Sequence, residues 1–140
     1  MMRRLLAGLA VAGGAYAALV PAVAFAAPGP VAPGDRLTVT VSDSGGGDGT
    51  FQLFCGPTGG DHPQARQACE RLDELALSGG DPFAPVPRDA LCTMQYGGPG
   101  AAHVTGVWQG RSVDAAFNRG NGCEIARWNA MEPVLPAARA

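Results

Sequence analysis

The sequence predicts an α+β fold, in which an antiparallel sheet packs against one or two helices and two disulfides join the elements. Two stretches with alternating apolar residues indicate hairpins, one amphipathic segment indicates a helix, and four cysteines allow two bridges. The 140-residue chain has a formal net charge of −2, and all 10 of its basic residues are arginine. It lacks the basic stripe of nucleic-acid-binding domains, so DNA and RNA are not expected partners.

The first residues have the pattern of a signal peptide, which we expect to span residues 1–26. Arg3 and Arg4 precede a long apolar run, and Ala24-Phe25-Ala26 has small residues at the two positions that a signal peptidase reads. Cleavage after Ala26 leaves residues 27–140, which have the size of one ordinary domain. The protein is therefore predicted to be secreted and extracellular, without a membrane partner.

The first predicted hairpin joins residues 37–42 to residues 51–55 and follows a proline-rich arm at 27–34 that we expect to be flexible. In both strands apolar side chains occupy every second position, which is typical of half-buried strands: Leu37, Val39 and Val41, then Phe51, Leu53 and Cys55. A glycine-rich turn at residues 44–49 separates them. The two strands therefore form an antiparallel pair.

A helix is predicted over residues 63–77. Its apolar residues recur at helical spacing, at positions 65, 68, 69, 72, 75 and 76. Pro63 suits a first helical position, and Ser78-Gly79-Gly80 ends the helix. Cys69 lies on the apolar stripe, so a disulfide to Cys55 would hold the helix against the second strand.

The segment Leu91-Cys92-Thr93-Met94-Gln95-Tyr96 is the candidate functional site. Proline-rich sequence precedes it and Gly97-Gly98-Pro99-Gly100 follows it, so it is predicted to be an extended loop. Met94 is a large apolar side chain, and Cys92 can fix the backbone two residues before it. This pattern is typical of a peptide that is presented to the cleft of another protein.

The second predicted hairpin covers residues 103–113, with its turn at Gln109-Gly110. Beyond it we expect a short helix that includes residues 115–117 and a last strand at residues 123–128. The C-terminal residues 133–140 contain two prolines and no periodic pattern, so they are expected to be flexible.

The four cysteines are predicted to form two disulfides, because they all follow the signal peptide and export exposes them to an oxidising compartment. Three pairings are possible, and we favour Cys55–Cys69 and Cys92–Cys123, since each joins sequential neighbours across one element. The chain contains no CxxC pair, so a zinc site is disfavoured. No metal or other cofactor is predicted.

Four fragments in this order resemble the Streptomyces subtilisin inhibitor family of secreted serine protease inhibitors. They are His62-Pro63 before the predicted helix, the loop from Leu91 to Tyr96, Gly106-Val107-Trp108-Gln109-Gly110, and Asn121-Gly122-Cys123-Glu124. Residues 118–120 look like an insertion relative to the family pattern. Each fragment is weak by itself, but their order and the four cysteines make the match specific.

The resemblance implies a five-stranded antiparallel sheet, a homodimer joined through the sheets, and the two disulfides favoured above. It implies that Met94–Gln95 is the bond offered to a subtilisin-like protease, with Met94 in the primary specificity pocket. A long uncharged side chain also suits chymotrypsin-like enzymes. The protease-contacting residues would be Leu91, Cys92, Thr93 and Tyr96, and Asn121 would support the loop from behind.

Two other functional classes are compatible with parts of the sequence. His62 and His103 with nearby acidic and serine residues could belong to a hydrolase, but no GxSxG-like nucleophile motif is present, so the protein is not expected to be an enzyme. A secreted binding module on the same fold, without inhibitory activity, is the second alternative. Inhibition of subtilisin by the folded protein separates that module from an inhibitor.

Overall fold

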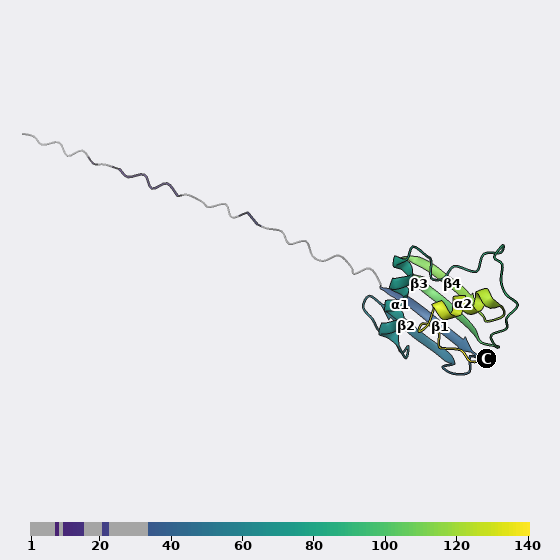
Figure 1. Ribbon diagram of the computed structural model, residues 1–140. Coiled ribbons are helices and arrows are strands. Elements are labelled where there is room, and N and C mark those ends of the chain that lie inside the picture. Colours follow the sequence, from purple (N-terminus) through teal and green to yellow (C-terminus); the bar gives the residue numbers. More distant parts are fainter. Residues whose placement is uncertain (1–7, 9, 16–20, 23–33) are drawn as a thin grey trace, which may run out of the picture. The chain divides into compact units, whose positions relative to one another are not determined.

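The computed structural model describes residues 8, 10–15, 21–22 and 34–140 (Figure 1). Contacts divide the chain into two units, Met1–Pro30 and Val31–Ala140, and every helix and strand of the described residues belongs to the second unit. Most of the predicted signal peptide, its cleavage site and most of the arm at 27–34 lie outside the described residues. Within the described ranges, no helix has the length and apolar character needed to cross a membrane.

Four antiparallel strands form one sheet in the order β2-β1-β3-β4. Their bounds are β1 Asp35–Ser42, β2 Gly49–Cys55, β3 Ala101–Trp108 and β4 Arg111–Phe117. Both predicted hairpins are confirmed, since β1 pairs with β2 and β3 pairs with β4. In the second hairpin, Gln109 and Gly110 have φ values of 48° and 76°, as a two-residue turn that matches the strand twist requires.

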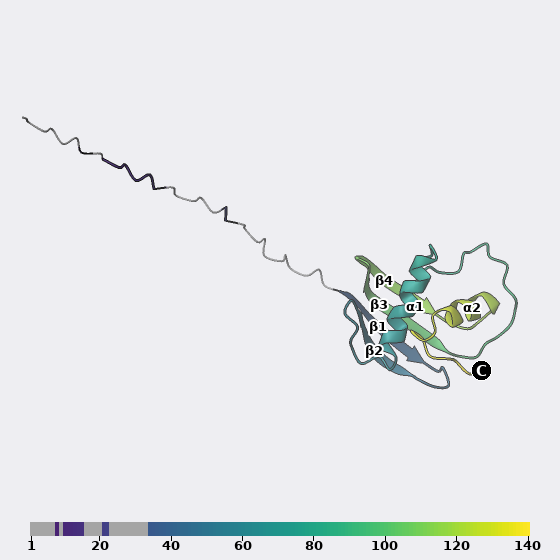
Figure 2. The ribbon, with the colours of Figure 1, turned by 60° about the vertical axis from the view of Figure 1, so that its left-hand side comes forward.

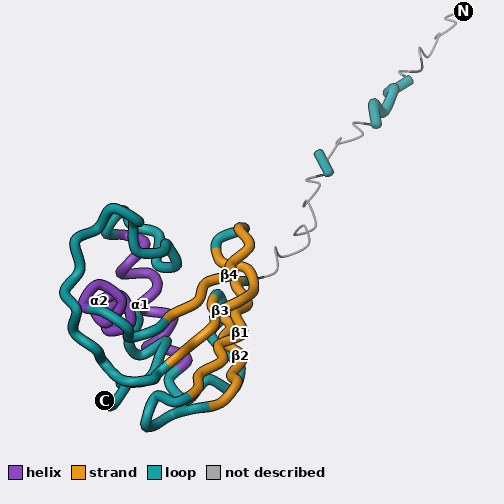
Figure 3. Tube along the Cα trace, turned by 90° about the vertical axis from the view of Figure 1, so that its right-hand side faces the viewer, coloured by secondary structure: helices purple, strands orange, loops and turns teal. Residues whose placement is uncertain are grey.

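Two helices cover one face of the sheet, and the core lies between them and the strands (Figures 2 and 3). Helix α1 spans Ala65–Leu77 and α2 spans Gly122–Ala130. The alternating apolar residues of the strands point into this core, where Leu37, Val39 and Val104 are at most 1% exposed. The Cys55–Cys69 disulfide joins β2 to α1, with 5.7 Å between the two Cα atoms. The predicted α+β fold is therefore confirmed in its layers.

The predicted five-stranded sheet is wrong for the described residues, where the sheet has four strands. Residues 123–128, expected to be the last strand, lie in α2, and Trp128 fills the core from that helix. Residues 115–117, expected to be helical, lie in β4, where Ala115 and Phe117 are buried and alternate with exposed neighbours. Pairing of Ala102 with Phe117 extends the sheet ladder over these positions.

The C-terminal segment is packed, so the expectation that residues 133–140 are flexible is wrong. Val134 and Leu135 are completely buried in the core. The segment is also held by hydrogen bonds: the His62 imidazole Nε2 lies 2.9 Å from the Val134 carbonyl, and the Trp128 indole donates to the Pro136 carbonyl at 2.8 Å. Two apolar side chains that enter the core outweigh the lack of a periodic pattern.

Candidate functional site

The connection from α1 to β3 carries the two most exposed large apolar side chains of the folded unit, those of Leu91 and Met94. It passes outside α2 (Figures 2 and 3). Leu91 is 100% exposed, Met94 94% and Tyr96 67%. Apolar side chains that gather on the surface of an otherwise well-packed domain indicate an interaction site. We call residues 91–96 the exposed loop.

A disulfide and a hydrogen bond fix the backbone just before Met94. Cys92 is bridged to Cys123 in the first turn of α2, with 5.3 Å between the Cα atoms. The Gly122 N–H donates to the Thr93 carbonyl at 3.1 Å. A Cβ atom at Gly122 would overlap the Thr93 hydroxyl, so only glycine allows this approach of helix and loop. The predicted Cys92–Cys123 bridge therefore anchors the exposed loop at its N-terminal side.

Arg119 anchors the other side of the loop. The Gly97 N–H donates to the Arg119 carbonyl at 2.8 Å, and the Arg119 Nε donates to the Gly97 carbonyl at 3.0 Å. Gly97 also lies against the side chain of Ile125, where a Cβ atom would come within 2.8 Å. Met94, Gln95 and Tyr96 thus span the distance between two fixed points with their side chains exposed.

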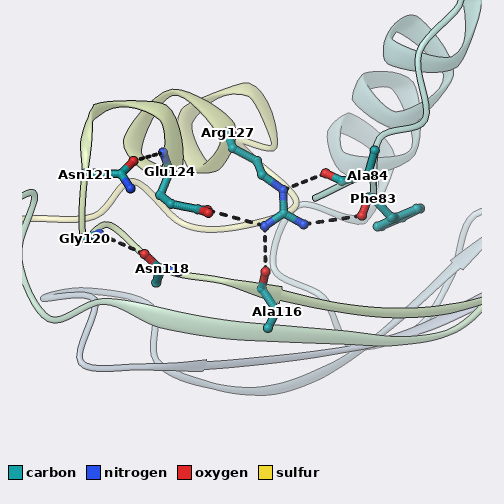
Figure 4. A network of polar contacts seen from close by, with 8 residues as sticks. All are labelled: Phe83, Ala84, Ala116, Asn118, Gly120, Asn121, Glu124 and Arg127. Atoms are coloured by element: carbon teal, nitrogen blue, oxygen red, sulfur yellow. Dashed lines mark hydrogen bonds and ion pairs between the residues drawn. The ribbon is translucent and has the colours of Figure 1, made fainter. Parts of the chain in front are cut away.

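Arg127 holds the first part of the connection between α1 and β3 against the rest of the domain (Figure 4). From α2 its guanidinium donates to three backbone carbonyls, at 2.9 Å to Ala84, 2.6 Å to Ala116 and 3.3 Å to Phe83. It also pairs with Glu124 at 3.6 Å. Burial is the main cause that lowers the pKa of Arg127, and Glu124 counteracts it by favouring the charged form. Helix α2, strand β4 and residues 83–84 are therefore held together by one side chain.

Asn121 lies at the start of α2. Its Oδ1 accepts a hydrogen bond from the Glu124 N–H at 3.0 Å, which makes Asn121 the N-cap of α2 (Figure 4). The first turn of that helix carries both Gly122 and Cys123, the two residues that hold the loop. The described hydrogen bond of the Asn121 side chain is therefore to the helix and not to the loop, and its role as loop support stays a prediction.

Sequence reasoning missed Arg119. In the sequence, residues 118–120 look like an insertion, and an arginine in an insertion is usually a solvated surface residue. Its partner Gly97 lies 22 residues earlier, and its second acceptor, the Asn129 Oδ1 at 2.9 Å, lies 10 residues later. No local pattern in the sequence connects these positions.

Comparison with known proteins identifies the family. Residues 34–121 match the family described as subtilisin inhibitor-like. Subtilisin inhibitor-like protein 1 of Streptomyces cacaoi is 42% identical over 83 residues, covering 56% of this chain and 71% of that protein. Plasminostreptin of Streptomyces antifibrinolyticus is 44% identical over 73 residues, covering 51% of this chain and 63% of that protein.

Among solved structures, Streptomyces caespitosus sermetstatin in complex with Bacillus licheniformis subtilisin aligns with a TM-score of 0.46 and 25% identity. The alignment covers 73% of this chain and 97% of that chain. The sequence matches carry the assignment: the chain belongs to the subtilisin inhibitor-like family.

Proposed function

We propose that the protein is a secreted, extracellular inhibitor of serine proteases of the subtilisin type and that Met94–Gln95 is its reactive bond. The observation that carries this proposal is the exposure of Met94, at 94%, on a short span of backbone that is fixed on both sides. Relatives that are named as subtilisin inhibitor-like proteins support the class of target. We propose no catalytic role and no cofactor for the chain.

The exposed loop would bind the protease as an extended substrate does. Main-chain hydrogen bonds supply much of the affinity in such complexes, and side-chain pockets supply selectivity. Met94 would enter the primary pocket, because it is long, flexible and uncharged. Leu91 and Tyr96, both exposed, would contact the enzyme on either side, with Cys92 and Thr93 between Leu91 and Met94.

Rigidity of the loop increases the affinity for the protease, because less entropy is lost on binding. A free peptide loses about 0.5–1.5 kcal/mol for each side chain that it immobilises on binding, together with backbone entropy. The Cys92–Cys123 bridge and the hydrogen bond to the Thr93 carbonyl fix the backbone before the protease arrives. Ordering the loop on the protease therefore costs less free energy than ordering a flexible substrate.

The same rigidity opposes digestion. The serine of the protease would attack the Met94 carbonyl, form an acyl-enzyme and release the Gln95 amine. Because the fold holds that amine near the ester, it can attack the acyl carbon again and restore the peptide bond while the serine recovers its proton. Religation then competes with hydrolysis by water, and the protease remains occupied.

Titration of subtilisin with the purified secreted protein tests this proposal. We expect loss of protease activity at a stoichiometric amount of inhibitor, followed by slow cleavage at Met94–Gln95 that mass spectrometry can locate. Full protease activity in the presence of the folded protein would contradict the proposal and favour a non-inhibitory binding module.

Met94→Lys tests the assigned position. A charged side chain in a broad apolar pocket should weaken inhibition of subtilisin by at least roughly 10- to 200-fold, the range for one extra or missing methylene group in such a pocket, and should create inhibition of trypsin. If the variant inhibits subtilisin as strongly as the wild type does and gains no inhibition of trypsin, another residue enters the primary pocket.

A further inference from the structure

We propose that Arg119 is a positioning residue that retains the Gln95 side of the reactive bond after cleavage, and thereby sets how long a protease stays inhibited. This inference rests on the proposed inhibitory function. It concerns the persistence of inhibition, whereas the proposed function concerns its occurrence, so the two can be tested separately.

The two sides of the reactive bond are held by different means. On the Met94 side, the Cys92–Cys123 disulfide lies two residues from the bond and is covalent. On the Gln95 side, the first fixed backbone is that of Gly97, which exchanges two hydrogen bonds with Arg119. Cleavage therefore frees a new amine whose position depends on noncovalent contacts.

The guanidinium of Arg119 is itself held in place. Its Nη1 donates to the Asn129 Oδ1 at 2.9 Å, and its central carbon lies 5.7 Å from the centre of the Trp128 ring. Trp128 is completely buried and Asn129 follows it on α2. Because one planar group contacts the loop, a helix side chain and an aromatic face together, it cannot leave Gly97 without losing its other contacts.

The C-terminal segment closes the space beneath the same part of the loop. A Cβ atom at Gly98 would lie 3.0 Å from the Ala140 Cα and 3.1 Å from the Arg139 carbonyl. The Arg139 N–H donates to the Ser44 carbonyl at 2.8 Å, which fixes this segment on the turn between β1 and β2. The loop residues after Gln95 are therefore placed between Arg119 and the packed C-terminal residues.

Chain geometry shows what these contacts do for religation. With Gly97 fixed, the Gln95 amine is two residues from an anchor and stays within about 7 Å of it. Without that anchor, the nearest residue that is paired in the sheet is Ala101 at the start of β3. The Gln95 amine can then lie up to about 20 Å from its nearest fixed residue. The accessible volume rises with the cube of the reach, so the effective concentration of the amine at the ester falls by at most roughly 20-fold.

The step that Arg119 favours is acyl transfer back to the amine. The Gln95 nitrogen attacks the Met94 acyl carbon, the ester bond to the protease serine breaks, and the proton lost by the amine returns to the serine oxygen through the protease histidine. Hydrolysis is the same step with water as nucleophile. A more confined amine raises the first rate and leaves the second unchanged.

Arg119→Met tests the inference, because methionine keeps an apolar chain against Trp128 and removes the hydrogen-bond donors of the guanidinium. Arg71→Met is the matched control: Arg71 also donates its Nε to a backbone carbonyl, that of Ala130 at 2.8 Å, and its Nη1 to a side-chain oxygen, that of Glu74 at 3.0 Å. Neither of its partners belongs to the exposed loop. Each variant loses one hydrogen bond to a backbone carbonyl and one to a side-chain oxygen.

The measurement is the recovery of subtilisin activity after stoichiometric inhibition, together with the fraction of inhibitor cut at Met94–Gln95. We expect Arg119→Met to inhibit initially and then to release active protease several-fold faster than the wild type, but by less than the limit of roughly 20-fold, since the backbone hydrogen bond to Gly97 remains. Arg71→Met should keep the wild-type recovery rate. Arg119→Lys should lie between, because one ammonium cannot serve both acceptors at once.

Equal recovery rates for Arg119→Met and the wild type would overturn the inference, as would equal acceleration by Arg71→Met. If Arg119→Met does not fold, Asn129→Ala decides in the same assay, because it removes the second acceptor at an exposed site. Asn129→Ala should then shorten inhibition, and an unchanged recovery rate would refute the role of Arg119. Failure of the wild type to inhibit at all would instead contradict the proposed function.

Discussion

Removal of each disulfide in turn separates the stability of the fold from the rigidity of the exposed loop. The bridges close 31 residues for Cys92–Cys123 and 14 residues for Cys55–Cys69. On the chain-entropy relation their loss destabilises the fold by about 3.7 and about 3.0 kcal/mol. The Cys92→Ala/Cys123→Ala and Cys55→Ala/Cys69→Ala variants should therefore lose similar amounts of stability, which denaturant unfolding measures.

Inhibition should respond to only one of these changes. Loss of Cys92–Cys123 frees the backbone of at least Cys92 and Thr93, and re-ordering them on the protease costs about 1–2 kcal/mol each. The inhibition constant for subtilisin should then rise by roughly 30- to 1,000-fold. The Cys55–Cys69 bridge lies between β2 and α1, so its removal should change the inhibition constant little as long as the protein is folded.

The assay is inhibition of subtilisin at a temperature at which circular dichroism shows both variants to be folded. A parallel rise of the inhibition constant in both variants would mean that affinity follows global stability. Unchanged inhibition by the Cys92→Ala/Cys123→Ala variant would mean that the bridge does not preorganise the loop. Either result refutes the reasoning about rigidity.

Three further changes are informative. Gly122→Ala places a methyl group on the Thr93 hydroxyl and should weaken inhibition of subtilisin about tenfold, with partial recovery in the Gly122→Ala/Thr93→Ala double variant. Hydrogen bonds from the Ser44 side chain and backbone lower the pKa of Asp48 below its ordinary 3.8, so Asp48→Asn should lose stability at neutral pH. Val107→Arg, at a 43% exposed position on the uncovered sheet face, should disrupt the predicted homodimer in light scattering and leave inhibition intact.

Each of these predictions has a control or a result that would contradict it. Gly80→Ala adds a methyl group with only the Leu75 carbonyl nearby, at 3.8 Å, and should leave inhibition unchanged. The contribution of Asp48 is full above pH 3.8 and is lost as pH falls through the lowered pKa, so unfolding curves of Asp48→Asn and wild type should converge on acidification. A wild-type protein that is monomeric at high concentration would contradict the homodimer.

Helix α1 and the strands, apart from residues 115–117 of β4, could be predicted because their signals are local. Alternation at Leu37, Val39 and Val41 identifies β1, since an antiparallel strand with one buried face has a period of two. The apolar stripe of α1 has helical spacing and ends at glycine. The helix begins at Ala65 and not at Pro63 as the sequence predicts. Such patterns depend on which face is buried and not on what covers it.

Helix α2 and the C-terminal segment were mispredicted because their structure depends on distant contacts. The nine residues of α2 include two aromatic or β-branched residues, Ile125 and Trp128, that are compatible with a strand. The signal that favours a helix is the N-cap at Asn121 with Glu124 three residues later. Val134 and Leu135 lack a periodic pattern, and only the tertiary structure shows that they enter the core.

The candidate site was predictable in part. The exposed loop and both disulfides follow from the cysteine positions and the family resemblance, and the structure contains both bridges. Arg119 was not predictable, because its contacts combine Gly97, Asn129 and the face of Trp128, which are adjacent only after folding. Support that comes from such long-range contacts leaves no motif in the sequence.

Mass spectrometry of the inhibitor incubated with a catalytic amount of subtilisin tests the central claim most directly. If a rigid loop presents Met94–Gln95, one slow cleavage should appear after Met94, with a persistent fraction of uncut protein and no further fragments. Rapid digestion that begins at any other bond would contradict the assignment of the reactive bond and the retention of the cleaved loop.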